Sequence, residues 1–384
     1  YDSAAEITIT AGATQALYAV FAAFVQPGDE VILFAPAYDS YAPAIRVHGG
    51  EPVWVKLREP NYQVDWDEVA SKITSRTRMI VINSPNNPTG NSLDRIDIET
   101  VLNHFNGLVV VDEAYINFSK QKSFVQSLED YPNLVVLQTL SKAWGLAGLR
   151  VGMCFANEAI VGYLNKVKAP YNINLPAQEL ALKALDEVGQ VNDMIQHLVE
   201  MRIALAEVIA SMPLVEKVYS SDTNFLLVKI PKATELYKFL CSKGIIVRDR
   251  SGLPNCEDTV RLTVGNEQEN TELVDAMAEW IEKTKKNNPK YFTKNGKLRQ
   301  KKLMDKLEKD PEFYKWFCEN EHLHIKKNEY DYPIQKWTAG MWSLLWNAWL
   351  AGHETIVDDR MGFGWVTNPY SDVEKYSILH NSGV

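Results

Sequence analysis

Cysteine is scarce in this chain of 384 residues. The few cysteines are scattered, and no two of them stand in a Cys-x-x-Cys spacing. This pattern argues against a disulfide framework and against a zinc site, and it indicates reduced thiols in a cytosolic protein without a bound metal. The cysteines are Cys154, Cys241, Cys256 and Cys318.

The sequence also lacks long apolar runs and an excess of positive charge. No run of about 18 apolar residues occurs and no signal peptide opens the chain, so we expect no membrane span and a cytoplasmic location. The net charge of −9 argues against a general nucleic-acid binder. The length allows two or three domains.

One lysine, Lys142, occupies a position that favours its use as an amine nucleophile. Lys142 lies in the stretch TLSKAWGLAGLR (residues 139–150), directly after the apolar run 134–137. A lysine at a strand end, walled by apolar residues, can lose its proton and attack a carbonyl, and pyridoxal phosphate is the commonest cofactor held in this way. The alternative is a solvated loop lysine. Eight residues later, Arg150 is predicted to open another apolar strand.

Two further polar clusters follow β-rich runs. They are SPNNPTG (residues 84–90), after the run 79–82, and DEAY (residues 112–115), after the run 108–111. In open α/β sheets, ligands bind at the carboxyl ends of parallel strands. Strands and helices alternate through this region, so we predict an α/β fold with a mostly parallel sheet.

The start of the chain contains a candidate anion site. Residues 6–10 alternate like a strand, and the turn Ala11-Gly12-Ala13-Thr14 leads into an apolar helix over 15–21. A small-residue turn at a helix N-terminus suits a phosphate. The alternative is an ordinary N-cap by Thr14 or Thr10.

The second half of the chain is predicted to be helical and then mixed. The expected helices cover 157–166, 177–209 with a break around 187–189, and 271–283; the expected strands cover 224–228, 244–250 and 259–265.

The three clusters, in this order, resemble motifs of the fold-type I, class I/II aminotransferases. The resemblance extends over residues 1–284. The resemblance implies the aspartate aminotransferase-like fold of pyridoxal-phosphate-dependent transferases, a homodimer, and amino-acid and 2-oxo-acid substrates. It also implies a large cofactor domain over 1–175 and a smaller α+β domain with a bridging helix over 176–284. Residues 285–384 remain as an extra tail.

The resemblance assigns a role to each matching residue. Lys142 holds the cofactor as a Schiff base and moves the proton, Asp112 balances the charge of the pyridine nitrogen, and Tyr115 with Asn87 contacts the phenolic oxygen. Tyr38 stacks on the ring. The phosphate contacts implied are Gly12, Ala13, Thr14, Thr139, Ser141 and Arg150, and the substrate contacts are Arg261, Arg248 and Asn224.

Each of these positions also has a structural interpretation. Tyr38 is otherwise a core tyrosine with a satisfied hydroxyl, and Asp112 is otherwise a helix cap. Arg150 and Arg261 are otherwise exposed charges at strand ends or edges.

The sequence resembles two branches of the family. Residues 91–284 resemble histidinol-phosphate aminotransferase. This resemblance implies histidinol phosphate as the amino donor and 2-oxoglutarate as the acceptor. Residues 1–90 are closer to methionine or kynurenine aminotransferases. Three alternatives stay open: a methionine or aromatic amino-acid aminotransferase, a decarboxylase or C–S lyase of the same fold, and a non-catalytic fusion.

Both ends of the sequence depart from the family pattern. The family carries several tens of residues before the position of Tyr1, so we expect substrate closure and dimer assembly to be affected. The tail begins with a basic tract over 283–309, continues with six tryptophans, and ends in a segment (377–383) that faintly resembles a glycosyltransferase C-terminus. A core-facing helix is the simpler interpretation of the tryptophan spacing.

Overall fold

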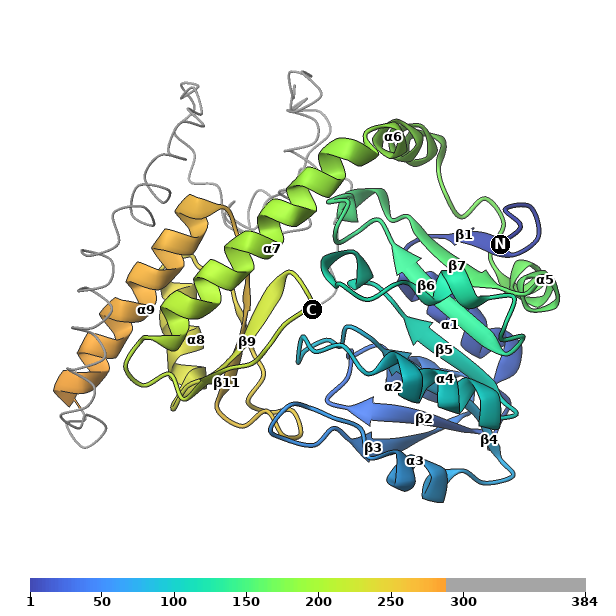
Figure 1. Cartoon of the computed structure of the whole chain (residues 1–384), viewed down its shortest axis with the longest axis horizontal. Helices are drawn as coiled ribbons and strands as arrows, with labels where there is room; N and C mark the ends of the chain where they lie inside the picture. The colour runs from blue at the N-terminus through green and yellow to red at the C-terminus, as the bar shows by residue number, and fades with distance from the viewer. Residues whose placement is uncertain (288–384) are drawn as a thin grey trace, which may run out of the picture.

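The computed structural model describes residues 1–287 (Figure 1). The predictions for the basic tract beyond residue 287, the tryptophan-rich segment and the glycosyltransferase-like segment therefore lie outside the described residues. Cys154, Cys241 and Cys256 are free thiols.

A seven-stranded sheet organises the first part of the chain. Only β7 runs against its neighbours, since it pairs antiparallel with both β1 and β6, and all other pairs are parallel. The predicted mostly parallel sheet is thus confirmed. Across the sheet the strands are β1 (Ile7–Thr10), β7 (Gly152–Ala156), β6 (Leu134–Thr139), β5 (Leu108–Asp112), β4 (Thr77–Asn83), β2 (Glu30–Ala35) and β3 (Glu51–Lys56).

Helices cover both faces of this sheet, which explains why its central strands are apolar without interruption. Along β4, Ile80 and Ile82 pack on one face whereas Met79 and Val81 pack on the other. The first face is covered by α3 (Trp66–Lys72) and α4 (Arg95–His104). The second is covered by α1 (Ala13–Phe24), α2 (Tyr41–Val47) and α5 (Glu158–Val167).

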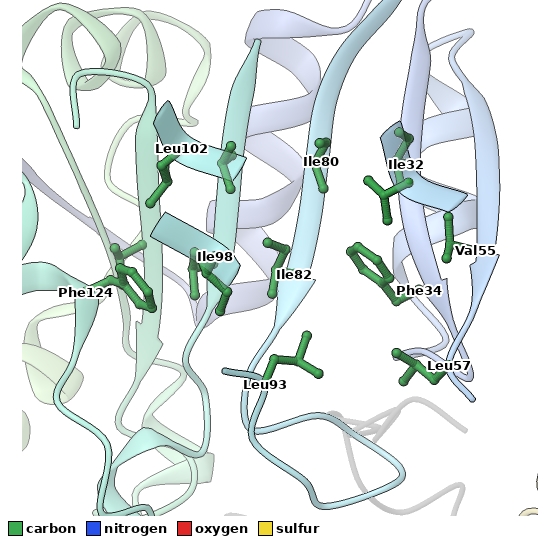
Figure 2. Close-up of a cluster of buried hydrophobic side chains, with 14 of the residues drawn as sticks. Ile32, Phe34, Val55, Leu57, Ile80, Ile82, Leu93, Ile98, Leu102 and Phe124 are labelled. Carbon is green, nitrogen blue, oxygen red and sulfur yellow. The ribbon is translucent and has the colours of Figure 1, made fainter. Parts of the chain in front are cut away.

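Helix α4 illustrates how the sequence specifies one of these layers. The Asp94 side chain accepts a hydrogen bond from the backbone N–H of Ile96 and so caps the helix N-terminus. Four residues apart, Ile98 and Leu102 share one helical face and enter the core beside Ile80 and Ile82 (Figure 2). Between them, Thr100 is exposed to solvent.

A second, four-stranded sheet has its own core. Its strands, in order, are β10 (Arg248–Asp249), β11 (Thr259–Thr263), β9 (Phe225–Lys229) and β8 (Lys217–Val218), and it packs with α8 (Ala233–Ser242) and α9 (Glu267–Asn287). The long helix α7 (Val188–Ala210) runs diagonally across the molecule and joins the two sheets (Figure 1). Domain boundaries at residues 175 and 284 stay predictions.

The helix break expected around 187–189 is confirmed, because α6 (Leu175–Asp186) ends one residue before it and α7 begins at Val188. Two strand predictions were wrong. The strand expected over 244–250 is only β10, because Gly244 and Ile245 donate backbone hydrogen bonds that terminate α8. Arg150 does not open β7 but follows a short 3₁₀ helix with a φ of 55°.

Within residues 1–287, no helix combines the length and apolar character that crossing a bilayer requires. In the same part of the chain, no group of three or more histidine, cysteine or acidic side chains is arranged to hold a metal ion.

Two isoleucines of α4 provide a matched test of this packing. Ile98 is 0% exposed whereas Ile96 is 71% exposed. We expect Ile98→Ala to lower the free energy of unfolding by about 3 kcal/mol, since it removes buried methyl groups and leaves a cavity. Ile96→Ala should change it by less than about 0.5 kcal/mol. Urea denaturation checks both values; equal effects of the two substitutions would contradict the packing.

Candidate active site

The carboxyl ends of β4, β5 and β6 meet at one edge of the large sheet and open into a cavity of about 150 Å³. A larger cavity, of about 400 Å³, lies between α7 and the β8–β9 side of the second sheet. Only the smaller cavity gathers the polar clusters predicted from the sequence. Its lining consists of Ala13, Thr14, Leu17, Tyr38, Asn83, Asn87, Asp112, Ala114, Tyr115, Thr139, Ser141, Lys142 and Arg150.

Lys142 lies three residues after β6 ends, on the turn that borders the cavity. Its Nζ is 5.5 Å from the centroid of the Tyr115 ring. The side chain is exposed, which corrects the expectation that apolar residues wall it in. The reason is that Lys142 lies on a turn beyond the end of the strand, where its side chain borders the open cavity and is not enclosed by apolar residues. The amine is therefore accessible to a bound molecule.

Asp112 is the last residue of β5 and is buried. Its Oδ2 accepts a 2.6 Å hydrogen bond from the Tyr41 hydroxyl, and its Oδ1 accepts one from the backbone N–H of Ala114 at 3.0 Å. Burial raises the pKa of the Asp112 carboxyl, and the bond from Tyr41 offsets part of that rise. Burial also raises the pKa of Tyr41, so its hydroxyl stays protonated and donates.

Tyr41 and Asn83 are site residues that the sequence reasoning missed. Tyr41 begins α2, three residues after Tyr38, and its ring packs edge-on against Tyr38 with centroids 5.5 Å apart. Asn83 ends β4, donates to the backbone carbonyl of Asp112 at 2.9 Å and accepts from the Asn87 backbone N–H at 2.8 Å. No local sequence pattern signals Tyr41, because its contact with Asp112 joins positions 71 residues apart.

Glu113, the residue after Asp112, makes hydrogen bonds that stabilise the end of β5. The buried Glu113 carboxylate accepts hydrogen bonds from the Ser123 hydroxyl, the Phe124 backbone N–H and the Gln138 side chain. Gln138 belongs to β6, so this contact ties the strand that precedes Lys142 to β5.

The N-terminus of α1 forms the other part of the cavity. Gly12 is its N-cap, and no side chain caps the helix, so the alternative of an N-cap by Thr10 or Thr14 is wrong. Ala13 and Thr14 line the cavity together with Arg150, which places a cation and the positive end of a helix dipole side by side. Arg150 Nη1 donates to the Ser141 hydroxyl at 3.4 Å.

Two glycines permit this close approach. A Cβ on Gly12 would lie 2.5 Å from Arg150 Nη2, and one on Gly152 would lie 2.3 Å from the backbone nitrogen of Ala13. Any side chain at residue 152 would therefore displace the start of α1. Thr139 stabilises the turn that bears Lys142, since its hydroxyl accepts a hydrogen bond from the Ser141 backbone N–H at 3.1 Å.

The donor set fits pyridoxal phosphate. Arg150 and the N–H groups of Ala13 and Thr14 suit a phosphate, and the buried Asp112 carboxylate suits a protonated ring nitrogen. Lys142 supplies an accessible amine. Tyr115 is buried within the same lining, with its ring edge-on to Phe225 at 5.3 Å.

The three predicted substrate residues are placed differently. Arg261 Nη1 donates to the Asn87 side-chain oxygen at 2.5 Å and so connects to the cavity. Arg248 is paired with Arg261 across β10 and β11. Asn224 precedes β9 and is half-buried. Its backbone carbonyl accepts a hydrogen bond from the Val264 N–H, and the residue is not part of the cavity lining.

Arg261 lies in a strongly positive surrounding. Burial, reinforced by the charges of Arg250 and Arg248, lowers the pKa of Arg261 to about 10. Its guanidinium lies 4.8 Å from the Phe225 ring centroid. It remains cationic at neutral pH and is available to an anion.

Comparisons with known proteins agree with this geometry. The family model for aminotransferase class I and II matches residues 1–277. The chain is 43% identical over 267 residues to a histidinol-phosphate aminotransferase of Parabacteroides distasonis, an alignment that covers 69% of this chain and 77% of that protein.

Solved structures are similar as well. A histidinol-phosphate aminotransferase from Clostridium acetobutylicum superposes with a TM-score of 0.67 at 24% identity, covering 71% of this chain and 83% of the other, which bears on the fold alone. An Escherichia coli protein with a methionine aminotransferase function gives a TM-score of 0.66 at 28% identity, covering 72% and 78%.

The buried carboxylate leads to a prediction about stability. Since the folded pKa of Asp112 lies above the ordinary aspartate value of 3.8, the folded chain holds the proton more tightly, and stability falls as pH rises through that interval. We expect the unfolding free energy of the cofactor-free wild type to fall relative to that of Asp112→Asn between about pH 4 and neutral pH, by about 1 kcal/mol, because the variant has no buried carboxylate to ionise. Below about pH 4 both side chains are neutral, so the difference there reports only the change of hydrogen bonds.

Urea denaturation at the two pH values measures this difference. A wild type that loses no stability relative to the variant between these pH values would contradict the assignment of Asp112 as a carboxylate that burial destabilises.

Proposed function

Because this chain belongs to the class I and II aminotransferases, a family that works with pyridoxal phosphate, we propose that it transfers the amino group of histidinol phosphate to 2-oxoglutarate. The protein is a pyridoxal-phosphate-dependent aminotransferase. The observation that carries the proposal is one cavity in which an accessible lysine, a buried aspartate and an arginine come together. The choice of donor is supported by the 43% identity to a histidinol-phosphate aminotransferase.

The proposed chemistry assigns one task to each side chain. When bound, pyridoxal phosphate supplies an electron-withdrawing ring that accepts the electron pair of the substrate Cα–H bond. With pyridoxal phosphate bound, the Lys142 amine would hold the cofactor and would serve as the base for the proton on the substrate α-carbon. The Asp112 carboxylate, oriented by the 2.6 Å hydrogen bond from Tyr41, would balance the positive charge of the ring nitrogen.

The remaining contacts orient the cofactor. Arg150, Ser141 and the start of α1 would bind its phosphate, and Tyr38 would pack on its ring. Asn87 and Tyr115 would donate hydrogen bonds to its phenolic oxygen. Asn87 also accepts from Arg261 at 2.5 Å, so the cofactor contact and the substrate anion contact share one hydrogen-bonded side chain.

The two substrates of the proposed reaction carry different anions. Histidinol phosphate carries a phosphate monoester and no carboxylate, whereas 2-oxoglutarate carries two carboxylates. Arg261 and the neighbouring Arg248 supply planar, fixed donors that suit either anion. One positively charged region therefore serves both halves of a ping-pong cycle.

A second candidate is a methionine or aromatic amino-acid aminotransferase. It is favoured by the similarity of residues 1–90 to that branch and by the Escherichia coli structure at 28% identity. An uncharged substrate side chain would not use the second anion contact. A decarboxylase or C–S lyase of the same fold is distinguished by release of carbon dioxide or ammonia in place of a 2-oxo acid.

We also propose that two copies of the chain associate through the segment 163–188, which contains the C-terminal half of α5, all of α6 and the first residue of α7. Exposed large apolar side chains are concentrated there, and such concentrations mark interaction surfaces. They are Tyr163, Val167, Tyr171, Leu175, Leu180, Leu182, Leu185 and Val188. A cytoplasmic location is proposed as well, since a reducing compartment preserves the free thiols of Cys154 and Cys256.

A spectroscopic titration tests the proposed reaction. Adding pyridoxal phosphate to the purified protein should produce a saturable visible absorption band, which histidinol phosphate removes and 2-oxoglutarate restores. Lys142→Ala should lose this band and lower kcat by at least about a thousandfold, because the covalent link and the proton carrier are both lost.

Lys56→Ala is the matched control, since Lys56 is exposed on β3 and outside the cavity, and it should behave as wild type. A kcat/KM for methionine above that for histidinol phosphate would replace the proposed donor by the second candidate. A band that persists in Lys142→Ala would contradict the assignment of the lysine.

The proposed dimer is tested by a charge on α6. Leu182 is 64% exposed, so Leu182→Asp should not disturb the fold of one copy but should weaken association. Light scattering should change from twice 43.5 kDa to 43.5 kDa. Ile96→Asp, at a similarly exposed position of α4 (71%), is the control. A wild-type mass of one chain at all concentrations would contradict the proposal.

A further inference from the structure

Charged residues from the two sheets meet beside the cavity. Asp39 follows Tyr38 in the segment between β2 and α2, and Arg250 follows β10 of the second sheet. Arg250 Nη1 lies 3.6 Å from Asp39 Oδ2. The Asp39 side chain is 60% exposed whereas that of Arg250 is 16% exposed. An exposed carboxylate therefore contacts a largely enclosed guanidinium.

This group has more positive than negative charge. Arg248 and Arg250 act electrostatically on Arg261 with the same sign, and Asp39 acts on it with the opposite sign. Asp249, which lies between the two arginines in the chain, is a second carboxylate that interacts with the charge of Arg250. Three guanidinium groups and two carboxylates leave one formal positive charge in excess. An anion matches that excess, whereas an uncharged group does not.

The hydrogen-bond donors of the group are also incompletely used. The Nε atoms of Arg250 and Arg261 are buried, and neither has a hydrogen-bond partner within residues 1–287. Buried guanidinium donors normally have acceptors, because leaving one unpaired costs free energy. Both atoms are therefore unused donors of these two guanidinium groups.

We propose that Arg250 is a third arginine of the substrate anion site and that Asp39 competes with the substrate for it. In the free protein Asp39 pairs with Arg250, and the phosphate or distal carboxylate of a substrate displaces the Asp39 side chain. The inference rests on the proposed function, since it names a residue that selects among substrates of that site.

Asp39 is suited to be displaced. It is well exposed, so its carboxylate regains water when it leaves Arg250, and an ion pair of this kind contributes little free energy. The competition therefore weakens the binding of anionic substrates without preventing it. Substrates with uncharged side chains do not compete with Asp39, so the residue shifts the preference of the enzyme toward them.

The decisive experiment measures anion binding apart from catalysis. Inorganic phosphate is titrated into protein saturated with pyridoxal phosphate, so that the cofactor phosphate contacts are occupied, and its dissociation constant is read by phosphorus NMR. Asp39→Asn should tighten phosphate binding about threefold, because a competing exposed carboxylate is removed. Arg250→Gln should weaken it by at least about threefold.

The double variant tests whether the two residues act together. If Asp39 acts through Arg250, Asp39→Asn should have no further effect in the Arg250→Gln background. Glu279→Gln is the matched control, because Glu279 is an exposed carboxylate paired with Lys243 and Lys283 away from the cavity, and it should leave phosphate binding unchanged.

Each outcome has a defined meaning. Unchanged or weaker phosphate binding in Asp39→Asn would overturn the proposal and make the Asp39–Arg250 pair only a link between the two sheets. Failure of the proposed function is seen separately, as a wild type that binds phosphate as expected but does not use histidinol phosphate. Among active variants, Asp39→Asn should raise kcat/KM for histidinol phosphate relative to methionine by about threefold.

Discussion

The parallel alignment of β4, β5 and β6 is the constraint on which the active site depends. In this register Asn83 lies opposite Asp112, and both stand at the carboxyl ends of their strands. Lys142 follows β6 by three residues at the same edge. The two faces of these strands pack against two different helical layers, so a shift by one residue would exchange the side chains that each layer packs against. Core packing thereby sets the positions of the polar groups.

The site combines burial with charge, and the two conditions oppose each other. Asp112 remains in an interior that disfavours its ionised form, and Tyr41 and the Ala114 backbone N–H offset only part of that cost. Under the proposed function, the same burial would strengthen the interaction of the carboxylate with a positive ring nitrogen. A group that destabilises the cofactor-free chain would then become favourable when the cofactor binds, which would link cofactor binding to folding stability.

Much of this arrangement could be predicted from the sequence because the information is local. An apolar run followed by a polar cluster specifies a strand end, and three such units brought Asn87, Asp112 and Lys142 to one edge. The missed features arise between segments distant in the chain. Tyr41 meets Asp112 across 71 positions, and no local pattern encodes that contact. Arg150 was expected in a strand, although the preceding glycine-containing turn extends to it and gives it a φ of 55°.

The contact between Gly152 and the start of α1 has a consequence for how this scaffold can change. With only 2.3 Å available to a Cβ, the backbone of β7 acts as a spacer that sets the depth of the helix end beside Arg150. Loops on the rim, such as the one bearing Asp39, are free of this restriction. Substitutions in such loops can therefore alter substrate contacts without moving the start of α1, whereas substitutions at residue 152 cannot.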